Sequence, residues 1–154
     1  MRRKASVSAR AISGDGSKLC VGIAVARFNG DITEKLLAGA RETLRAWGVK
    51  DARVSIARVS GSYELPLACA RLIKRHKLDA VVALGCIIKG ETKHDEYLAH
   101  AVSTGLMQVM LSTNTPIGFG VITANTLQQA RARARGAANK GSEAAAAALE
   151  SAIV

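Results

Sequence analysis

The chain has 154 residues, 49% of them hydrophobic, a size and composition that suit one domain with a self-supporting core. Its formal net charge of +10 suits anionic ligands, but the basic residues are scattered and aromatic side chains are not interleaved with them, which disfavours nucleic acid as a partner. No run of residues is long and apolar enough to cross a bilayer, and no apolar segment follows the basic start as in a signal peptide, so we expect a cytoplasmic protein without a membrane partner.

The first strand is expected shortly after a polar N-terminal segment. Residues 1–17 are polar and end in glycines, so we expect a flexible arm ahead of a single α/β domain at residues 18–154. The near-continuous apolar run at residues 19–26 is typical of a strand buried on both faces of a parallel sheet. Arg27-Phe28-Asn29-Gly30 ends this strand.

A helix and a second strand follow. Gly30 or Asp31 is a candidate cap for a helix that extends to about Trp47 and has its apolar residues on one face. Residues 54–59 are rich in β-branched side chains and predict the second strand. The Ser-Gly-Ser turn at residues 60–62 then leads into a second helix.

The third unit carries the clearest chemical signal. The uncharged run at residues 80–88 predicts a buried strand, and a polar loop with Gly90 and Thr92 separates it from a helix at about residues 95–111. A strand, a glycine turn and a helix N-terminus bring unpaired backbone N–H groups together, which favours an anion site. His94 lies beside this site and is a candidate proton carrier.

The fourth unit completes the domain. Residues 117–123 predict a strand and residues 126–135 a helix. After a break at residues 139–141, an alanine-rich helix is expected at residues 142–152.

Strands that alternate with helices predict an α/β fold, which we expect to be a flavodoxin-like three-layer sandwich with a four-stranded parallel sheet and helices on both faces. Ligands bind such sheets beyond the carboxyl ends of the strands. The segments at that edge are Arg27-Phe28-Asn29, Gly61-Ser62-Tyr63-Glu64, residues 89–94 and residues 123–125. They supply an aromatic face, a carboxylate and an anion-binding turn, which favours a pocket for a flat polar ring and a phosphate. The alternative is that each segment is an ordinary polar turn.

Other chemistries fit the sequence less well. Ser62 lies in a strand-to-helix turn but lacks the second glycine of the G-x-S-x-G nucleophile motif. His94 and His100 are about 240° apart around a helix, so they cannot bind one metal ion, and we expect no metal site. We interpret His100 as structural. The three cysteines lack C-x-x-C spacing and are interpreted as small buried hydrophobic residues.

Three arginines alternate near the end of the fourth helix. On a continuous helix, Arg131 and Arg135 share one face and Arg133 lies near the opposite one. We therefore expect one face to contact the pocket and the other to contact solvent. A fully solvated basic helix is the alternative.

The ordered motifs resemble those of the lumazine synthase family over almost the whole chain from about residue 19. In order, they are Arg27-Phe28-Asn29, Gly61-Ser62-Tyr63-Glu64-Leu65-Pro66, Leu84-Gly85-Cys86-Ile87-Ile88-Lys89-Gly90 with Thr92 and His94, Pro116-Ile117-Gly118-Phe119-Gly120-Val121-Ile122-Thr123, Gln129-Ala130 and Asn139-Lys140-Gly141. Any one of these motifs is weak, whereas the ordered series is specific.

The resemblance implies an enzyme of riboflavin biosynthesis that belongs to the transferases. Such an enzyme condenses 5-amino-6-ribitylamino-uracil with 3,4-dihydroxy-2-butanone 4-phosphate to 6,7-dimethyl-8-ribityllumazine, phosphate and water, without a metal or redox cofactor. The resemblance also implies a homo-oligomer built from pentamers, alone or assembled into decamers or sixty-subunit shells, with each active site between neighbouring subunits.

Family similarity also implies roles for individual residues. Phe28 is expected to stack on the pyrimidine, Glu64 to accept ribityl hydroxyls and His94 to move protons. Arg133 is expected to bind the phosphate together with Gly90-Glu91-Thr92. The remaining expected substrate-binding residues are Asn29, Gly61, Ser62, Tyr63, Cys86, Ile87 and Ile88, with Phe119, Lys140 and Glu143 supplied by the neighbouring subunit.

The chain departs from the family pattern at three places. Ser60 stands where proline is expected. Glu91 puts a carboxylate beside the expected phosphate, which is unfavourable unless it points away or pairs with a neighbouring lysine. The segment at residues 133–139 is one residue shorter than usual, so Arg131 or Arg135 is an alternative phosphate ligand. Two other functions are alternatives: a non-catalytic flavin- or nucleotide-binding module on the same sheet, and a basic nucleic-acid binder.

Overall fold

The structure is a computed structural model that describes residues 14–154. Within this range four strands and five α-helices alternate along the chain. In order they are β1 (Val21–Ala26), α1 (Gly30–Ala46), β2 (Val54–Val59), α2 (Leu65–Arg75), β3 (Ala80–Ile88), α3 (His94–Thr113), β4 (Ile117–Ala124), α4 (Leu127–Ala132) and α5 (Lys140–Ala152). Short 3₁₀ turns at Asp51–Arg53, Ser62–Glu64 and Gly136–Ala138 join some of them.

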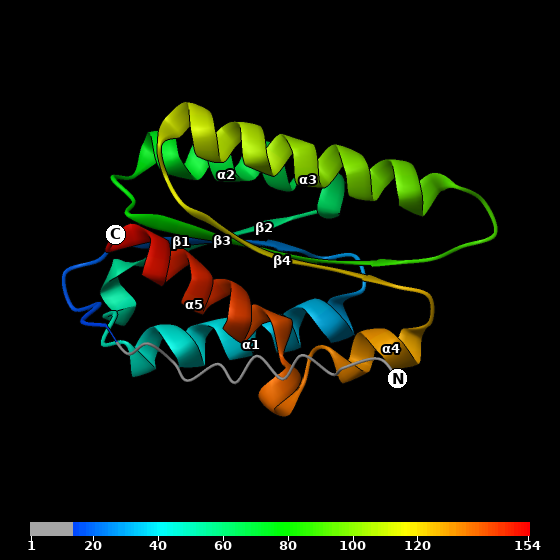
Figure 1. Cartoon of the computed structure of the whole chain (residues 1–154), viewed down its shortest axis with the longest axis horizontal. Coiled ribbons are helices and arrows are strands. Elements are labelled where there is room, and N and C mark those ends of the chain that lie inside the picture. Colours follow the sequence, from blue (N-terminus) through cyan, green and yellow to red (C-terminus); the bar gives the residue numbers. More distant parts are fainter. Residues whose placement is uncertain (1–13) are drawn as a thin grey trace.

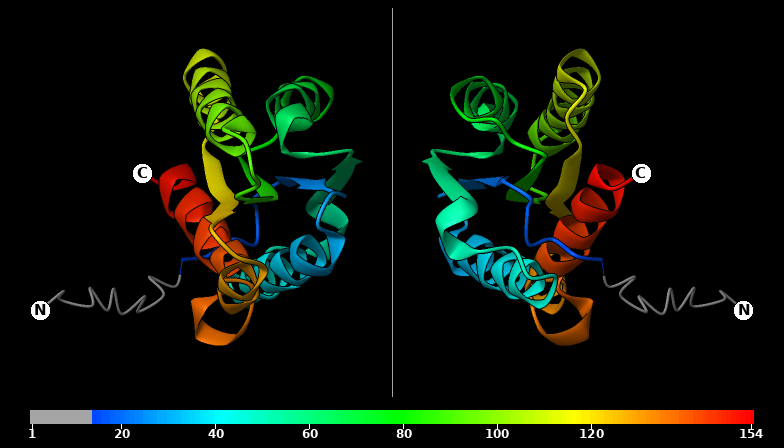
Figure 2. Two further views of the ribbon diagram at one scale, coloured as in Figure 1. Left: turned by 90° about the vertical axis from the view of Figure 1, so that its right-hand side faces the viewer. Right: turned by 90° about the vertical axis from the view of Figure 1, so that its left-hand side faces the viewer.

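The four strands form one sheet of order β2-β1-β3-β4 in which every neighbouring pair is parallel. Helices α2 and α3 cover one face of the sheet, and α1 and α5 cover the other (Figure 1). The two end-on views in Figure 2 show the same three layers, with the sheet between the two helical layers. The predicted α/β flavodoxin-like sandwich is therefore confirmed.

Strand β3 is central to both hydrophobic cores. Eight of its nine residues are buried, as are all six of β1. Successive side chains of β3 point to opposite faces, so Val82 and Leu84 pack with α1 and α5 while Val81 and Ala83 pack with α2 and α3. A charged residue on this strand would face one core or the other, which explains why the run is uncharged.

Helix α5 lies close to β4 and α1 because the facing residues are small. A Cβ atom added at Gly118 would collide with the carbonyl group of Ala144, and one added at Gly141 would collide with that of Leu36. The alanine-rich sequence of α5 and the two glycines therefore serve the same purpose, which is a short distance between backbones.

Several helix boundaries differ from the sequence prediction, and two of the differences concern residues of the candidate site. Helix α1 is capped by Asn29 rather than by Gly30 or Asp31, and the backbone of Asn29 is in the left-handed region with φ of 58°. Helix α4 ends at Ala132 and not at residue 135 as predicted. The chain turns instead at Gly136, whose φ of 55° is left-handed, so the face assignment of the three arginines does not apply.

The beginning of the described range contacts the domain. The N–H group of Gly16 donates to the carbonyl of Trp47 at 2.7 Å, so residues 14–17, which we assigned to the arm, pack against the end of α1. Residues 1–13 lie outside the described residues. None of the helices in the described range has a stretch long and apolar enough to cross a membrane.

The Gly118→Ala substitution is expected to lower the free energy of unfolding by about 1–3 kcal/mol, because the added methyl group overpacks the contact between β4 and α5. Gly30→Ala is the matched control, since nothing lies within 4 Å of a Cβ atom added there, and no loss of stability is expected. Urea unfolding at equal protein concentration measures both changes. Equal stabilities of the two variants would show that the α5 contact is loose.

Candidate active site

A hollow of about 860 Å³, which we call the ring pocket, opens at the carboxyl ends of β1, β2 and β3. Aromatic and apolar side chains line it together with carboxylates and one imidazole. The lining residues are Phe28, Gly61, Ser62, Tyr63, Glu64, Cys86, Ile87, Ile88, Gly90, Thr92, His94, Asp95, Tyr97, Leu98 and Ala101. The side chains of Phe28 and Tyr63 are about 70% exposed, so their rings are free to stack on a planar ligand.

A second hollow of about 620 Å³, which we call the basic hollow, lies at the carboxyl ends of β3 and β4. Its walls are formed by Ile87, Lys89, Thr92, Lys93, Asp95, Glu96, Ala99, His100, Thr123, Ala124, Asn125, Gln129 and Arg133. Three cationic side chains and several hydrogen-bond donors thus converge on it, opposed by two carboxylates. This composition suits a phosphate group, which lysine and arginine bind by charge-assisted hydrogen bonds.

The two hollows are neighbours. Ile87, Thr92 and Asp95 line both, because the loop between β3 and α3 separates them. In Figure 1 this loop extends furthest to the right, at the edge where all four strands end. One ligand that carries both a ring and a phosphorylated chain can therefore reach both hollows across one loop. So can two ligands of which one carries the ring and the other the phosphate.

The turn after β1 is held to the neighbouring strands by hydrogen bonds. The N–H groups of Arg27 and Phe28 donate to the carbonyls of Val59 and Ser60 at 2.7 and 3.0 Å. The side-chain amide of Asn29 donates to the carbonyl of Cys86 at 2.9 Å. We expected Asn29 to bind substrate, but it is not among the residues that line the ring pocket. Its amide instead joins the turn that carries Phe28 to the end of β3.

The Gly61-Ser62-Tyr63-Glu64 turn also positions its functional groups through local contacts. One carboxylate oxygen of Glu64 accepts a hydrogen bond from the N–H of Gly61 at 3.1 Å, which leaves the other oxygen free for a ligand. Ser62 is buried, and its side chain occupies the space that a Cβ atom at Gly85 would need. The glycine of β3 therefore lets the turn lie directly over the strand.

The loop between β3 and α3 leads into the first turn of α3. His94 begins this helix, and its backbone N–H donates to the side-chain oxygen of Thr92 at 3.3 Å. Glu91 lines neither hollow and makes no ion pair within the described residues, so it does not pair with Lys89 or Lys93. Nothing in the structure explains its presence in this turn.

The three arginines have separate surroundings. Arg133 lines the basic hollow and donates from its guanidinium to the carbonyl of Gln129 at 3.1 Å. Arg131 instead approaches the carboxylate of Asp31 at 4.0 Å, and Arg135 lines neither hollow. Of the three candidates, only Arg133 is placed to bind an anion in the basic hollow.

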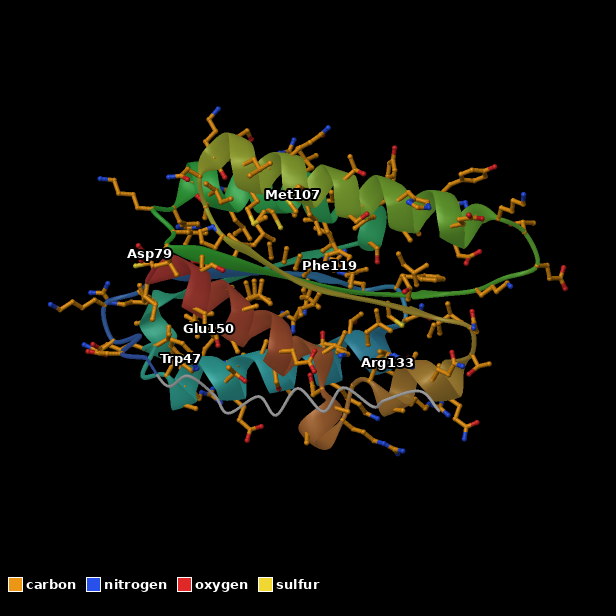
Figure 3. The ribbon with its side chains drawn as sticks, in the orientation of Figure 1. Trp47, Asp79, Met107, Phe119, Arg133 and Glu150 are labelled. Carbon is orange, nitrogen blue, oxygen red and sulfur yellow. The ribbon has the colours of Figure 1, made fainter. Side chains whose placement is uncertain are left out.

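Phe119 and Lys140 lie outside both hollows of their own chain. Phe119 is 53% exposed on β4, and Figure 3 shows it midway along that strand while Arg133 lies near α4. The ammonium group of Lys140 forms an ion pair with Glu143 at 2.8 Å. Neither residue therefore contributes to the two hollows of its own chain.

His100 lines the basic hollow, where the sequence analysis did not place it. Its side chain is exposed, so it does not pack in the core. On α3 the residues that face this hollow are Asp95, Glu96, Ala99 and His100. These positions share one face of the helix. Helical spacing counted from Asp95 in the first turn would have indicated that His100 lies on this face.

Comparison with known proteins identifies the family. A sequence model of the 6,7-dimethyl-8-ribityllumazine synthase family matches residues 18–154. The chain belongs to this family. It is 53% identical over 129 residues to the lumazine synthase of Thermus thermophilus, which covers 83% of this chain and 82% of the relative. It is 44% identical over 140 residues to the one from Lactiplantibacillus plantarum, covering 90% and 87%, and 46% identical over 137 residues to that of an Anaeromyxobacter strain, covering 88% and 84%.

The lumazine synthase match confirms the resemblance seen in the ordered motifs. It spans both hollows and every candidate site residue. The chain is therefore an enzyme of the lumazine synthase family rather than a non-catalytic flavin module or a nucleic-acid binder. Within the described residues, no three His, Cys, Asp or Glu side chains cluster as metal ligands would.

The cysteines of this lumazine synthase family member differ in burial. Burial, with a smaller contribution from the Asp31 carboxylate, raises the pKa of the Cys86 thiol to about 11. Burial also raises the pKa of the Cys69 thiol to about 12. Both thiols are protonated at neutral pH, so neither is a nucleophile, although Cys86 lines the ring pocket. Cys20 is only partly buried.

Alkylation with iodoacetamide at pH 8 is expected to label Cys20 and to leave Cys69 and Cys86 unlabelled, because only a thiolate reacts and the two buried thiols are protonated. Mass spectrometry of peptides measures the labelling of each residue, and the same reaction in 8 M urea is the control in which all three react. Labelling of Cys86 in the folded protein would show that the ring pocket activates its thiol.

Proposed function

We propose that this protein condenses 5-amino-6-ribitylamino-uracil with 3,4-dihydroxy-2-butanone 4-phosphate to 6,7-dimethyl-8-ribityllumazine, phosphate and water, and that it does so in the cytoplasm. The observation that carries this proposal is the pairing of an aromatic pocket with a basic hollow across one loop. It is supported by relatives that bear the name 6,7-dimethyl-8-ribityllumazine synthase. Three unpaired cysteines fit a reducing compartment.

The ring pocket is assigned to the ribitylamino-uracil. The exposed ring of Phe28 stacks on the pyrimidine, and backbone groups at the ends of β2 and β3 bind its polar edge. The free carboxylate oxygen of Glu64 accepts from the ribityl hydroxyls. The Asn29 amide donates to the Cys86 carbonyl and so holds the turn that carries Phe28 to the end of β3.

The basic hollow is assigned to the phosphate of the second substrate. Arg133 supplies a guanidinium, and Thr92 supplies a donor from the loop that separates the hollows. Gly90 belongs to the same loop but lines the ring pocket. Lys89 and Lys93 add positive charge at the same loop. The phosphate leaves during the reaction, so a site that binds it without burying it deeply also permits its release.

The reaction requires little from the protein beyond orientation of the two substrates. The amine of the first substrate attacks the ketone of the second, and a first water is lost to give a Schiff base. Phosphate is then eliminated, and the ribitylamino nitrogen attacks the carbonyl formed, which closes the ring with loss of a second water. His94 lines the ring pocket at its border with the loop and moves protons in these steps. Since an amine and a ketone condense readily once aligned, holding the two substrates together supplies most of the acceleration.

The exposed surface of α3 supports assembly with other copies of the chain. Of its twenty residues only Val102 and Leu106 are buried, whereas Tyr97, Met107 and Leu111 are 69%, 50% and 73% exposed. Apolar side chains in such numbers on one layer are typical of an interface between subunits. We propose a homo-oligomer in which Phe119 and Lys140 of one subunit complete the ring pocket of its neighbour.

A direct assay tests the proposed activity. Purified protein mixed with both substrates is expected to form the fluorescent lumazine well above the rate of the spontaneous reaction. Omission of either substrate is the control. A protein that binds flavin tightly and leaves the spontaneous rate unchanged would contradict the proposal.

The His94→Ala variant is expected to lose no more than about a hundredfold in kcat, towards the low end of a general acid–base contribution, because orientation supplies most of the catalysis. His76→Ala is the matched control, since His76 lies at the far end of α2 outside both hollows. Steady-state kinetics of the assembled variants measures the effect. Complete loss of activity with intact assembly would show that proton transfer dominates.

The Met107→Glu variant is expected to weaken assembly, because it buries a charge in the proposed interface on α3. Ala38→Glu, on the exposed face of α1 in the opposite helical layer, is the matched control. Sedimentation velocity measures the size of wild type and both variants. A Met107→Glu protein that sediments like the wild type would place the interface elsewhere.

A further inference from the structure

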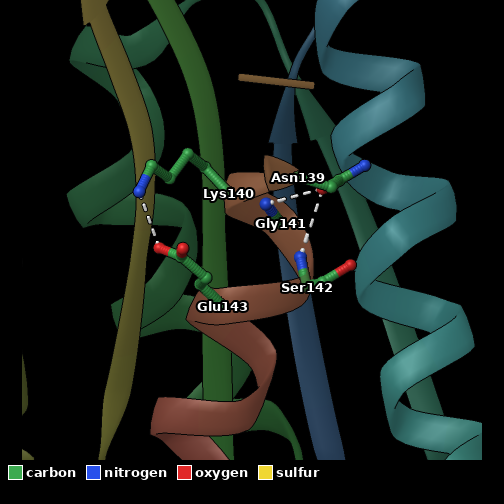
Figure 4. A network of polar contacts seen from close by, with 5 residues as sticks. All are labelled: Asn139, Lys140, Gly141, Ser142 and Glu143. Atoms are coloured by element: carbon green, nitrogen blue, oxygen red, sulfur yellow. Dashed lines mark hydrogen bonds and ion pairs between the residues drawn. The ribbon is translucent and has the colours of Figure 1, made fainter. Parts of the chain in front are cut away.

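Asn139 is a buried polar residue with an unusually complete set of hydrogen bonds. It is 7% exposed. Its side-chain oxygen accepts from the N–H groups of Gly141 and Ser142 at 2.8 and 3.2 Å, which caps α5 (Figure 4). Its side-chain nitrogen donates to the carbonyls of Lys35 and Ala134, both at 3.0 Å. One amide thus joins α1, the end of α4 and the start of α5.

The cap alone does not account for these contacts. An N-cap needs only the side-chain oxygen, and serine or aspartate provides it as well as asparagine does. The two bonds from the amide nitrogen go to carbonyls outside α5, in segments that are 104 and 5 residues away along the chain. These bonds require two donors. Ionised aspartate has none and serine has only one, on a shorter side chain, so asparagine alone supplies both bonds while it also caps the helix.

The residues held in this way are next to two cations of the proposed site. Arg133 precedes Ala134, and its carbonyl accepts from the N–H of Lys140 at 2.8 Å. The bond between the Asn139 amide and Ala134 lies beside it, so residues 133 and 140 close a short stem whose loop turns at Gly136. This is the segment that the sequence analysis expected to be one residue shorter than the family pattern, and the stem fixes both of its ends.

Packing leaves this stem little freedom to move. A Cβ atom at Gly39 of α1 would approach the Asn139 side chain to 2.5 Å, and one at Gly141 would collide with the carbonyl of Leu36. The glycines therefore let the stem lie directly on α1, and the bond to the Lys35 carbonyl anchors it there. A displacement at Asn139 is transmitted to the backbone of Arg133.

We propose that Asn139 is a positioning residue that holds Arg133 in the basic hollow through the two hydrogen bonds donated by its side-chain amide. This inference rests on the proposed function only in assigning the phosphate of the substrate to Arg133. Asn139 touches no substrate, so its loss acts on the affinity for phosphate and not on the affinity for the ring.

The test uses Asn139→Asp, which keeps the cap but cannot donate when ionised, and Asn139→Ser, which keeps the cap without a charge. In assembled protein, both are expected to raise KM for the phosphorylated butanone about tenfold, with less than about a threefold change in KM for the ribitylamino-uracil. The dissociation constant for inorganic phosphate, measured by calorimetry without turnover, is expected to rise by a similar factor. Asn114→Asp is the matched control, since this exposed residue lies at the opposite edge of the sheet.

These measurements distinguish failure of the positioning role of Asn139 from failure of the proposed enzymatic function. Phosphate affinity and both KM values equal to those of Asn114→Asp would overturn the positioning role, as would a uniform loss that follows only the amount of assembled protein. If Asn139→Asp fails to fold, the serine variant decides by the same measurements. A wild-type protein that binds inorganic phosphate but makes no lumazine would overturn the proposed function and leave the phosphate comparison valid.

Discussion

The four strands of residues 14–154 are all parallel, and this constraint organises the rest of the described structure. Parallel pairing places the carboxyl ends of β1, β2, β3 and β4 at one edge, so every loop that follows a strand is delivered to the same place. It also requires helices on both faces, which forces β3 to be apolar along its length. The ring pocket and the basic hollow are products of this arrangement, and the loop after β3 is their common wall.

The strands could be predicted closely because their signals are local. The bounds of β2 and β3 agree with the prediction to the residue, since β-branched or uncharged runs there end at abrupt polar turns. Helix α4 was predicted too long because alternating alanine and arginine favour a helix, whereas the chain turns at Gly136 and Asn139 is then hydrogen-bonded to Lys35 of α1. No local pattern reports a hydrogen bond to a carbonyl 104 residues away.

The candidate site could likewise be predicted only in part from the sequence. Residues that follow strands, such as Phe28, Glu64 and Thr92, could be assigned to one edge from the topology alone. The bond from Asn29 to Cys86 and the place of His100 could not, because they depend on how neighbouring elements meet in space. Asn29 and Asn139 have the same kind of role. Each donates a hydrogen bond from its side-chain amide to a backbone carbonyl and thereby fixes a turn that carries a functional group.

The central claim is that each site joins both hollows of one chain with Phe119 and Lys140 of its neighbour. Complementation between two inactive chains tests it most directly. One chain carries Phe28→Ala and Glu64→Ala, and the other carries Phe119→Ala and Lys140→Ala. The two chains are co-expressed with different tags and purified as mixed oligomers. At equal proportions about a quarter of the sites pair two intact halves, so the account predicts about a quarter of wild-type lumazine formation. Mixed oligomers that show no activity above that of either parent would contradict a shared site.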